Sequence, residues 1–460
     1  MVRVRIAPSP TGSVHIGLVR SALYNWLFAR HHKGRFILRI EDTDPTRSTK
    51  ESLNEILEGF EWVGLQPDEG PYFQSQRFEL YRRYAEKLLK EGRAYYCYCS
   101  EERLEQERKR AEREHRVWKY DRRCLSLSSE ERERLEREKA PKVVRFLIPP
   151  KKVEFEDIIH GRIEKSPQDL DDFIILRRDG SPTYNFACVI DDAEMEITHV
   201  IRAVEHIANT PKQVLLYEAL GFKPPKFAHL PLILGKDKKK LSKRHGAVSL
   251  LEYRRMGYLP EAILNYLALL GWSPGGDKEI MSIEEMIESF TLEKVHKANA
   301  IFDERKLLWM NGEYMRMLPR DRILKELKRF INLETEDERL LKLVDLLRVR
   351  TKTLRELCQM MEPYIREEIE YDGEAVERFI LGKEERVRWL YEEFSLLKDF
   401  TAPSLEKSLR DLALRKGIKA AELIHPARVA VTGKSVGPPL FDALELIGRD
   451  RTLKRLKRWI

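Results

Sequence analysis

The sequence has few cysteines and no stretch apolar enough to cross a membrane. Only five cysteines occur among 460 residues, and a single residue separates Cys97 from Cys99. Such a sparse set is not a disulfide framework, which predicts a reducing, cytoplasmic location. No apolar run approaches the roughly 20 residues of a transmembrane helix, and residues 1–10 lack the apolar core of a signal peptide. We therefore expect neither a secreted disulfide scaffold nor a membrane protein.

Charge is abundant and nearly balanced. Charged residues make up 35% of the chain, and 84 Lys and Arg against 76 Asp and Glu give a net charge of +8. This small excess favours polyanions such as nucleic acid, but a charged surface that binds nothing fits equally well. With 42% hydrophobic residues the chain can form several buried cores, so we expect two to four domains.

The first forty residues predict a β-α-β unit. Residues 2–6 alternate apolar side chains with arginine, residues 18–27 have the apolar spacing of a helix, and residues 36–40 form a second apolar run. Such a crossover belongs to a doubly wound sheet, whose ligands bind beyond the carboxyl ends of the strands. Residues 8–12 and 41–44 follow those ends.

Later segments predict an insertion and a helical region. Residues 95–186 interrupt the α/β pattern with cysteines, a charged helical run and short strands. Strands are then predicted at residues 197–202 and 227–234, and between them a helix that begins with a capping box at residues 210–213 and ends at Gly221. Beyond residue 318 nearly all apolar positions have helical spacing, which predicts an all-α region.

Two polar segments lie where a phosphate would bind. Residues 13–17, with His15 and Gly17, lie where the first strand passes into its helix, so backbone N–H groups face the crevice. The lysine-rich residues 236–246 directly follow the last predicted strand. Each segment alone has an ordinary explanation, as a helix start or as a solvated charge run. Together they favour a triphosphate site, because ammonium groups bind phosphate as point charges.

Residues 5–12 with residues 15–17, and residues 240–244, resemble the two signatures of class I glutamyl-tRNA synthetases. Further matches to this family occur at residues 39–44, 70–72, 74–77, 182–186 and 309–312. The matches span nearly the whole chain in the family's order, which makes coincidence negligible. The resemblance implies a split Rossmann-type nucleotide-binding sheet (residues 1–94 and 187–246) with an inserted acceptor-stem domain (95–186), then a stem-contact domain (247–318) and an all-α anticodon-binding domain (319–460).

The resemblance also implies an activity and a set of site residues. The activity is ATP-dependent ligation of glutamate to tRNA(Glu) through a glutamyl-adenylate, with ATP and Mg²⁺ as cofactors and release of AMP and pyrophosphate. The residues implied to bind glutamate are Arg5, Ala7, Ser9, Glu41, Tyr184 and Arg202. Those implied to bind ATP are Thr11, His15, Gly17, Lys240, Ser242 and Lys243. His15 and Lys243 are the implied catalytic residues, which stabilise phosphate charge in the transition state.

The physical chemistry of glutamate agrees with this set, because two carboxylates and one ammonium need fixed cations and at least one anion. Arg5, Arg202 and Glu41 supply them. A structural alternative for Arg5 and Glu41 is a mutual ion pair at the strand edge.

Three positions depart from, or mimic, known patterns. Residues 202–206 keep Arg202 but not the family's usual acidic run, which leaves the roles of Val204 and Glu205 open. Cys188 is predicted to pack rather than to bind. Residues 432–435 resemble the end of a phosphate-binding loop, but Arg428 stands where that loop needs glycine, which predicts an ordinary loop.

Three cysteines of the insertion, Cys97, Cys99 and Cys124, predict a structural Zn²⁺. Ser126 stands where some family members have histidine, so Tyr120 or His115 would complete the ligand set. The alternative is three reduced cysteines packed near the acceptor stem, since some members of the family lack the metal.

The rival interpretations concern the transfer RNA. A glutaminyl-tRNA synthetase would read the anticodon with β-barrels, a truncated paralogue would lack residues after 318, and an RNA-binding protein without catalysis would have a damaged signature. We expect a monomer with glutamate and tRNA(Glu) as partners, or a non-discriminating enzyme that also accepts tRNA(Gln). Arg350 is predicted to inspect the third anticodon base, or otherwise to neutralise phosphates or an acidic helix face.

Overall fold

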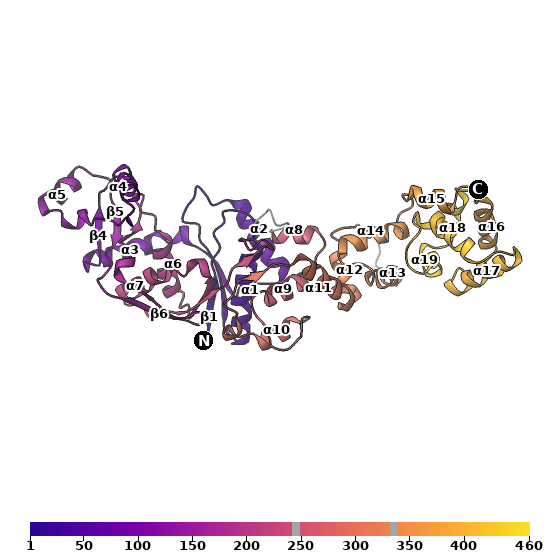
Figure 1. Ribbon diagram of the computed structural model, residues 1–460, viewed down its shortest axis with the longest axis horizontal. Coiled ribbons are helices and arrows are strands. Elements are labelled where there is room, and N and C mark those ends of the chain that lie inside the picture. Colours follow the sequence, from indigo (N-terminus) through magenta and orange to yellow (C-terminus); the bar gives the residue numbers. More distant parts are fainter. Residues whose placement is uncertain (242–248, 332–337) are drawn as a thin grey trace. The chain divides into compact units, whose positions relative to one another are not determined.

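The computed structural model describes residues 1–241, 249–331 and 338–460 and divides into two compact units (Figure 1). The first unit comprises Met1–Tyr253 and Ile263–Glu304, and the second comprises Arg254–Ala262 and Arg305–Ile460. Among the residues described, no helix is both long and apolar enough to cross a membrane.

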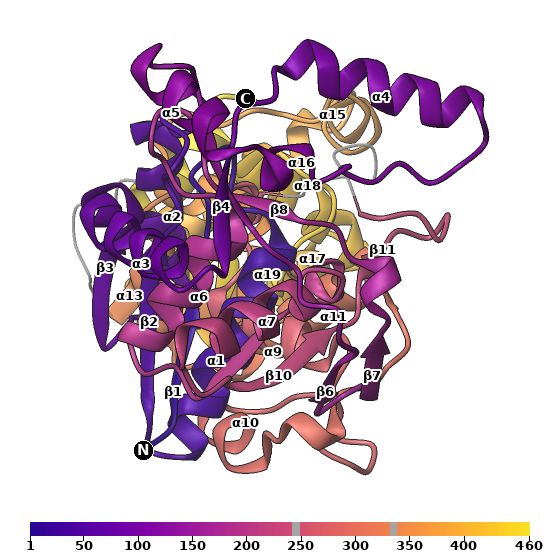
Figure 2. The same cartoon turned by 90° about the vertical axis from the view of Figure 1, so that its left-hand side faces the viewer.

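The first unit is built on parallel strands, as predicted. Strands β1 (Arg3–Ile6), β2 (Arg35–Ile40) and β3 (Glu69–Phe73) pair in parallel, and β1 and β2 run side by side in Figure 2. A second group pairs in the order β7 (Gly161–Lys165), β6 (Val153–Asp157), β10 (Lys226–Leu230), β9 (His199–Ala203), with only β6 and β7 antiparallel. The Arg3 carbonyl accepts a hydrogen bond from Thr198 N at 2.9 Å, which joins β1 to the segment entering β9.

Helices connect these strands and bury their apolar sides. They are α1 (Ile16–His31), α2 (Lys50–Val63), α3 (Phe78–Lys90), α6 (Tyr184–Glu194) and α7 (Thr210–Leu220). The predicted β-α-β unit is confirmed as β1, α1 and β2. Helix α7 ends at Gly221, as expected, because that residue adopts a φ of 77°, which glycine tolerates best.

The predicted capping box at the start of α7 is wrong. The N-cap is Asn209, whose side chain makes no capping hydrogen bond. The Thr210 hydroxyl donates instead to the His206 carbonyl at 3.2 Å, and the Gln213 side-chain oxygen accepts from Arg202 Nη2 at 2.8 Å. The Thr210 hydroxyl also accepts from Arg202 Nη2 at 2.8 Å, so both side chains are held by a buried arginine that local sequence could not reveal.

The insertion forms its own antiparallel sheet, in the order β4 (Ala94–Cys97), β5 (Val143–Phe146), β8 (Phe173–Leu176). Two charged helices, α4 (Glu101–Arg113) and α5 (Ser129–Arg137), accompany it. Phe146 of this sheet and Phe186 of α6 belong to one buried hydrophobic cluster. The insertion therefore shares a core with the parallel strands and the helices that cover them.

Short elements follow the second group of strands. Strand β11 (Ile233–Leu234) pairs in parallel with β12 (Ala300–Ile301). The helices of this stretch are α8 (Leu250–Arg255), α9 (Pro260–Leu269), α10 (Ile283–Ser289) and α11 (Glu304–Met317).

The second unit contains helices joined by turns and no strand among its described residues, which agrees with the predicted all-α region. Its remaining helices are α12 (Arg320–Leu327), α13 (Glu338–Arg348), α14 (Leu354–Ile365), α15 (Gly373–Phe379), α16 (Glu384–Ser395), α17 (Ala402–Arg415), α18 (Ala421–Thr432), α19 (Leu440–Ile447) and α20 (Arg449–Lys457). Gly433 caps the C-terminus of α18 with a φ of 75°. Residues 432–435 are thus a helix end and not a phosphate-binding loop, as the sequence predicted.

Candidate active site

A pocket of about 690 Å³ opens in the first unit where β1 and β9 end. The predicted site residues among those that line it are Arg5, Ala7, Ser9, Thr11, His15, Gly17, Glu41, Tyr184, Arg202 and Lys240. Ser242 and Lys243 lie outside the described residues. The structure thus brings the described residues of both predicted ligand sets, for glutamate and for ATP, to one pocket.

His15 begins helix α1, and the backbone fixes its ring. As the N-cap residue it accepts a hydrogen bond on Nδ1 from Leu18 N at 3.1 Å. The accepting nitrogen carries no proton, so Nε2 is the N–H donor of the neutral ring. Burial and then the charge of Lys240 lower the pKa of His15, which keeps the ring neutral at pH 7. Gly17 leaves room for this ring, since a Cβ there would lie 3.0 Å from Nδ1.

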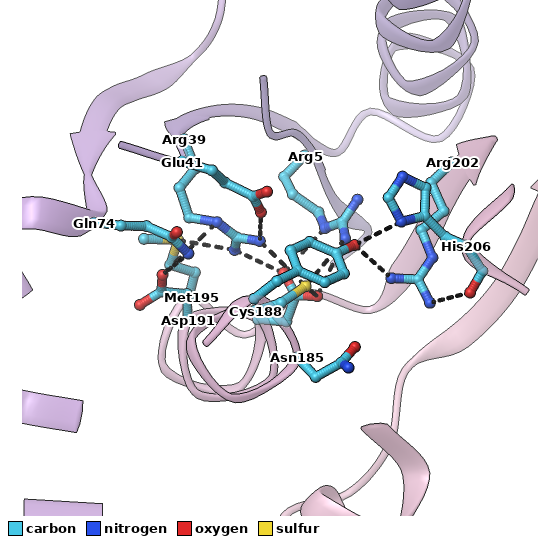
Figure 3. A network of polar contacts seen from close by, with 12 residues as sticks. Arg5, Arg39, Glu41, Gln74, Asn185, Cys188, Asp191, Met195, Arg202 and His206 are labelled. Atoms are coloured by element: carbon cyan, nitrogen blue, oxygen red, sulfur yellow. Dashed lines mark hydrogen bonds and ion pairs between the residues drawn. The ribbon is translucent and has the colours of Figure 1, made fainter. Parts of the chain in front are cut away.

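Two buried arginines, Arg5 and Arg39, reach across from β1 and β2 towards helix α6 (Figure 3). Arg5 Nε lies 3.0 Å from Asp192 Oδ1, and Arg39 Nη1 lies 2.7 Å from the same oxygen. Burial alone would raise the pKa of Asp192, but the two guanidinium charges hold it well below its usual value. The Cys188 thiol lies between the two guanidiniums and is fully buried, in keeping with its predicted packing role.

Glu41 follows β2 and faces Arg39, with its Oε1 3.5 Å from Arg39 Nη2. The alternative of an Arg5–Glu41 ion pair is therefore wrong. The reason is that α6 presents Asp192 to Arg5, a partner over 180 residues away in sequence. Burial raises the pKa of Glu41, and the charges of Arg39 and Arg5 offset this only in part. A further cation in the pocket, such as a substrate ammonium, would stabilise this carboxylate.

Arg202 lies one residue before the end of β9 and differs from the other two arginines in its partners. Its Nη1 donates to the Tyr184 hydroxyl at 3.2 Å, and its Nη2 donates to Thr210 and Gln213 at 2.8 Å each. Within the described chain, no carboxylate lies within ion-pair distance of this guanidinium. Arg202 and the neighbouring His206 are seen beside Arg5 in Figure 3. The pocket thus contains a cation whose charge the protein leaves available.

Lys240 and Glu205 pair at the pocket, with the lysine Nζ 2.7 Å from the carboxylate. Glu205, whose role the sequence left open, therefore restrains a lysine of the second signature. The partner of Glu205 could not be foreseen from the altered run at residues 202–206.

Several pocket partners were missed from the sequence, namely Asp192, Arg39 and His206. A signal existed for the first two. Asp191 and Asp192 interrupt an otherwise apolar helix, and Arg39 interrupts an apolar strand. Buried charges are costly unless they are paired, so these residues had to meet cations and anions from elsewhere in the chain. No comparable signal marked His206, whose Nδ1 lies 3.0 Å from the Tyr184 hydroxyl.

The three cysteines of the insertion gather into one cluster. Their Sγ atoms lie within 4.8 Å of one another. The Tyr120 hydroxyl lies 3.3 Å from Cys97 Sγ and 3.5 Å from Cys99 Sγ, and Cys99 and Cys124 are 3.5 Å apart. Tyr120 is buried, whereas His115 is exposed. Of the two fourth ligands that the sequence allowed, Tyr120 is the one at the cluster.

Arg350 lies in the second unit, exposed in the turn after α13. No carboxylate within the described ranges of the chain lies within ion-pair distance of it. Its charge, after burial, also lowers the pKa of Arg428, with Tyr364 acting in the opposite sense. Among the described residues, neither Arg350 nor Arg428 has a carboxylate within ion-pair distance, so both charges stay unpaired there.

A parallel sheet with a histidine-glycine turn at its first helix, followed by a helical unit, defines a class I aminoacyl-tRNA synthetase. The catalytic-domain family described as tRNA synthetases class I (E and Q) matches residues 1–309, and an anticodon binding domain matches residues 322–460. The chain belongs to this glutamate and glutamine family of class I tRNA synthetases.

Several proteins are similar to this chain over its whole length. The chain is 47% identical over 470 residues to a glutamate–tRNA ligase of Thermodesulfovibrio yellowstonii, covering 100% of this chain and 99% of that protein. A glutamate–tRNA ligase of Moorella thermoacetica is also 47% identical, over 482 residues covering 100% and 98%. The crystal structure of a glutamate tRNA ligase from Elizabethkingia meningosepticum in complex with its amino acid is similar, with a TM-score of 0.89, 39% identity and coverage of 99% and 98%.

Proposed function

We propose that the chain joins glutamate to the 3′ end of a glutamate transfer RNA, using ATP. The observation that carries the proposal is the Arg202 guanidinium, which no described carboxylate neutralises, in the same pocket as the neutral His15 donor. An anionic amino acid and a triphosphate both find a partner there. The full-length similarity to proteins named glutamate–tRNA ligase supports glutamate as the substrate.

The proposed reaction has two steps. A carboxylate oxygen of glutamate attacks the α-phosphorus of ATP, and the bond from that phosphorus to the bridging oxygen of pyrophosphate breaks. A ribose hydroxyl of the RNA then attacks the acyl carbon, and AMP leaves with the bonding electrons while the hydroxyl proton passes to a phosphate oxygen of the departing AMP. Mg²⁺ would enter on the triphosphate and neutralise its charge.

The chain's own residues position the substrates and stabilise the charge on the phosphates. His15 Nε2–H is free to donate to a phosphate oxygen, because Nδ1 is occupied by the helix cap. Arg202 holds a substrate carboxylate. Glu41 has a raised pKa, and the substrate ammonium stabilises its ionised carboxylate. Lys243, outside the described residues, is expected from the sequence to add an ammonium at the phosphates.

The test is aminoacylation with purified transfer RNAs and either glutamate or glutamine as the amino acid. We expect glutamyl-tRNA, with one AMP and one pyrophosphate per ester formed, and no charging with glutamine. Glutaminyl-tRNA made from free glutamine, or no charging of any RNA, would contradict the proposal.

We also infer that the enzyme prefers tRNA(Glu) to tRNA(Gln) and that Arg350 contributes to this choice. The support is its exposure and the lack of an acidic partner in the described second unit, which disfavours a structural role against an acidic helix face. A planar guanidinium can donate to the acceptor edge of cytosine at the third anticodon position. Arg350→Gln should narrow the preference by about 1–3 kcal/mol.

The matched control is Lys352→Gln, which removes a second exposed cation two residues away. If Arg350 meets only phosphates, both substitutions will weaken both RNAs alike. Equal charging of the two RNAs by the unsubstituted enzyme would make it non-discriminating.

A structural Zn²⁺ is our second proposal, held by Cys97, Cys99, Cys124 and Tyr120. Three separations between these ligand atoms, from Tyr120 to Cys97 and to Cys99 and from Cys99 to Cys124, are 3.3–3.5 Å, near the edges of a tetrahedron with metal bonds of about 2.0–2.3 Å. The hydrogen bond between Cys97 and Cys124, and then that with Tyr120, lowers the pKa of Cys97, while the same Cys97–Cys124 bond raises the pKa of Cys124. Arg103 donates to Cys99 Sγ at 3.0 Å, a contact that suits a thiolate better than a thiol.

Bound zinc would cross-link strand β4 to the segment around Cys124. Elemental analysis of protein purified without chelator should give about one zinc per chain. Cys124→Ser should lose it, whereas Cys358→Ser, in helix α14, should keep it. A zinc content well below one in the unsubstituted protein would reject this site.

A further inference from the structure

The Arg202 guanidinium is held by almost all of its hydrogen-bond donors. Nε donates to His229 Nε2 at 3.2 Å, Nη2 donates to Thr210 and Gln213, and Nη1 donates to Tyr184. A guanidinium has five N–H groups, so these contacts leave one N–H of Nη1 for a ligand. The direction of that N–H is therefore set by the four contacts and not by the flexible side chain.

His229 is a fully buried residue of β10, and each of its two ring nitrogens makes a contact in this network. Its Nδ1 lies 2.6 Å from Asp157 Oδ2. Hydrogen bonds to Asp157, first from His229 itself, outweigh burial and lower the pKa of that carboxyl, so it is ionised and Nδ1 must be the donor. Nε2 is then left without a proton and can accept from Arg202 Nε.

Asp157 is itself fixed by the backbone. Its Oδ1 accepts hydrogen bonds from Ile159 N at 3.0 Å and His160 N at 2.9 Å, and its Oδ2 accepts from His229 N at 3.1 Å. The carboxylate ends β6, and β6 pairs with β10, which pairs with β9. Three neighbouring strands therefore carry Asp157, His229 and Arg202 in a fixed line.

We propose that Asp157 and His229 are positioning residues for glutamate, which act by holding His229 in the tautomer that accepts from Arg202. If the ring carried its proton on Nε2, that N–H would face the Arg202 Nε–H and push the guanidinium out of line. Neither residue lines the pocket, so both would act on a bound substrate only through Arg202. The inference rests on the proposed role of Arg202 as a glutamate ligand.

Substitutions at His229 can remove its contact with Arg202 while keeping its contact with Asp157, or the reverse. The side-chain amide of asparagine reaches the place of Nδ1, and that of glutamine reaches the place of Nε2. His229→Asn can thus still donate to Asp157 but offers Arg202 no acceptor, whereas His229→Gln can offer the acceptor. Asp157→Asn places an amide against Nδ1 and favours the opposite tautomer of His229, as in other carboxylate–histidine pairs.

The measurement is steady-state aminoacylation, with KM determined separately for glutamate and ATP. We expect His229→Asn and Asp157→Asn to raise KM for glutamate about tenfold or more. KM for ATP should change less than about twofold, and His229→Gln should lie between His229→Asn and the unsubstituted enzyme. Equal rises in KM for glutamate and ATP, or no rise for glutamate, would overturn the proposal.

Two smaller substitutions, both at Thr210, test the same proposal in case the variants of His229 and Asp157 fail to fold. Thr210→Val removes a hydroxyl that contacts both Arg202 Nη2 and His229 Nε2, at 2.8 and 3.1 Å, with almost no change of shape, while Thr210→Ser retains it. Only Thr210→Val should raise KM for glutamate. An equal KM in Thr210→Val and Thr210→Ser would count against the proposed positioning of Arg202. Should the unsubstituted enzyme fail to charge glutamate at all, the proposed function fails, whereas normal charging with unaffected variants refutes this inference alone.

Discussion

His15 has one observed and one proposed role for its two ring nitrogens. Nδ1 caps helix α1, and Nε2–H is left for the phosphate contact that we propose. Asparagine is a good N-cap but has no donor at the position of Nε2. His15→Asn should therefore keep the stability of the protein while kcat falls by about 10²–10³-fold.

His15→Ala is the companion variant, because it removes both functions. It should lose the same activity and in addition about 1 kcal/mol of stability, the usual cost of a lost cap. Urea unfolding and aminoacylation kinetics measure the two effects. A His15→Asn enzyme with normal kcat would refute the role of His15 at the phosphates.

His199, at the start of β9, predicts a pH dependence of stability. Burial, followed by the charges of Lys226 and His32 and against that of Glu293, lowers the pKa of His199 to about 4. The unfolded chain binds this proton near pH 6.5 and the folded chain does not, so the contribution of His199 is complete above that pH and is lost as pH falls towards 4. Between pH 7 and 5, Tm should fall less in His199→Gln than in the unsubstituted protein. Identical changes in Tm would show that His199 carries no such linkage.

At the level of elements, Asp192 joins helix α6 to strands β1 and β2. Its carboxylate is the common partner of Arg5 and Arg39, and all three side chains are buried. Asp192→Asn retains the shape but leaves two buried cations with less compensation. We expect a loss of about 3–5 kcal/mol in the free energy of unfolding.

Glu154→Gln is the matched control for Asp192→Asn. Glu154 pairs with Arg162 on the solvent side of β6 and β7, where ion pairs add little. Urea unfolding should detect no change in this variant. If Asp192→Asn were as stable as Glu154→Gln, the buried charge cluster would not be what holds α6 to the sheet.

At the scale of the whole molecule, the net charge of +8 predicts salt-sensitive binding of transfer RNA. Raising salt from about 50 to 200 mM should raise Kd for the RNA at least about tenfold, because cations that meet phosphates release counterions. KM for glutamate should change less, since its proposed ligands are buried and poorly screened. Filter binding at several salt concentrations gives the slope of log Kd for the RNA against log salt concentration.

Arg350 can be assigned by the same slope. A contact to a phosphate would make Arg350→Gln lower the slope by about one, alike for both RNAs, whereas a contact to a base would change selectivity. A slope and a selectivity that both stay unchanged would exclude Arg350 from the RNA interface.

Local pattern determined much of the molecule. The alternation in residues 2–6 and the apolar run at 36–40 are β1 and β2, and the leucine-spaced residues beyond 318 form helices wherever they are described. These elements follow from period and turn residues, which act within a few positions. The motifs at residues 5–17 also marked the pocket, because strand ends of one sheet meet at one edge. The four boundaries between the five predicted segments stay a prediction.

Partner choice at the site was decided only by tertiary structure. Arg5 pairs with Asp192 instead of Glu41, residues Thr210 and Gln213 hold Arg202 instead of capping α7, and Tyr120 instead of His115 reaches the cysteines. In each case the sequence supplied residues of the right chemistry but offered more than one partner. A buried charge takes the partner that the packing of distant strands and helices brings within about 3 Å, and no local pattern encodes that distance.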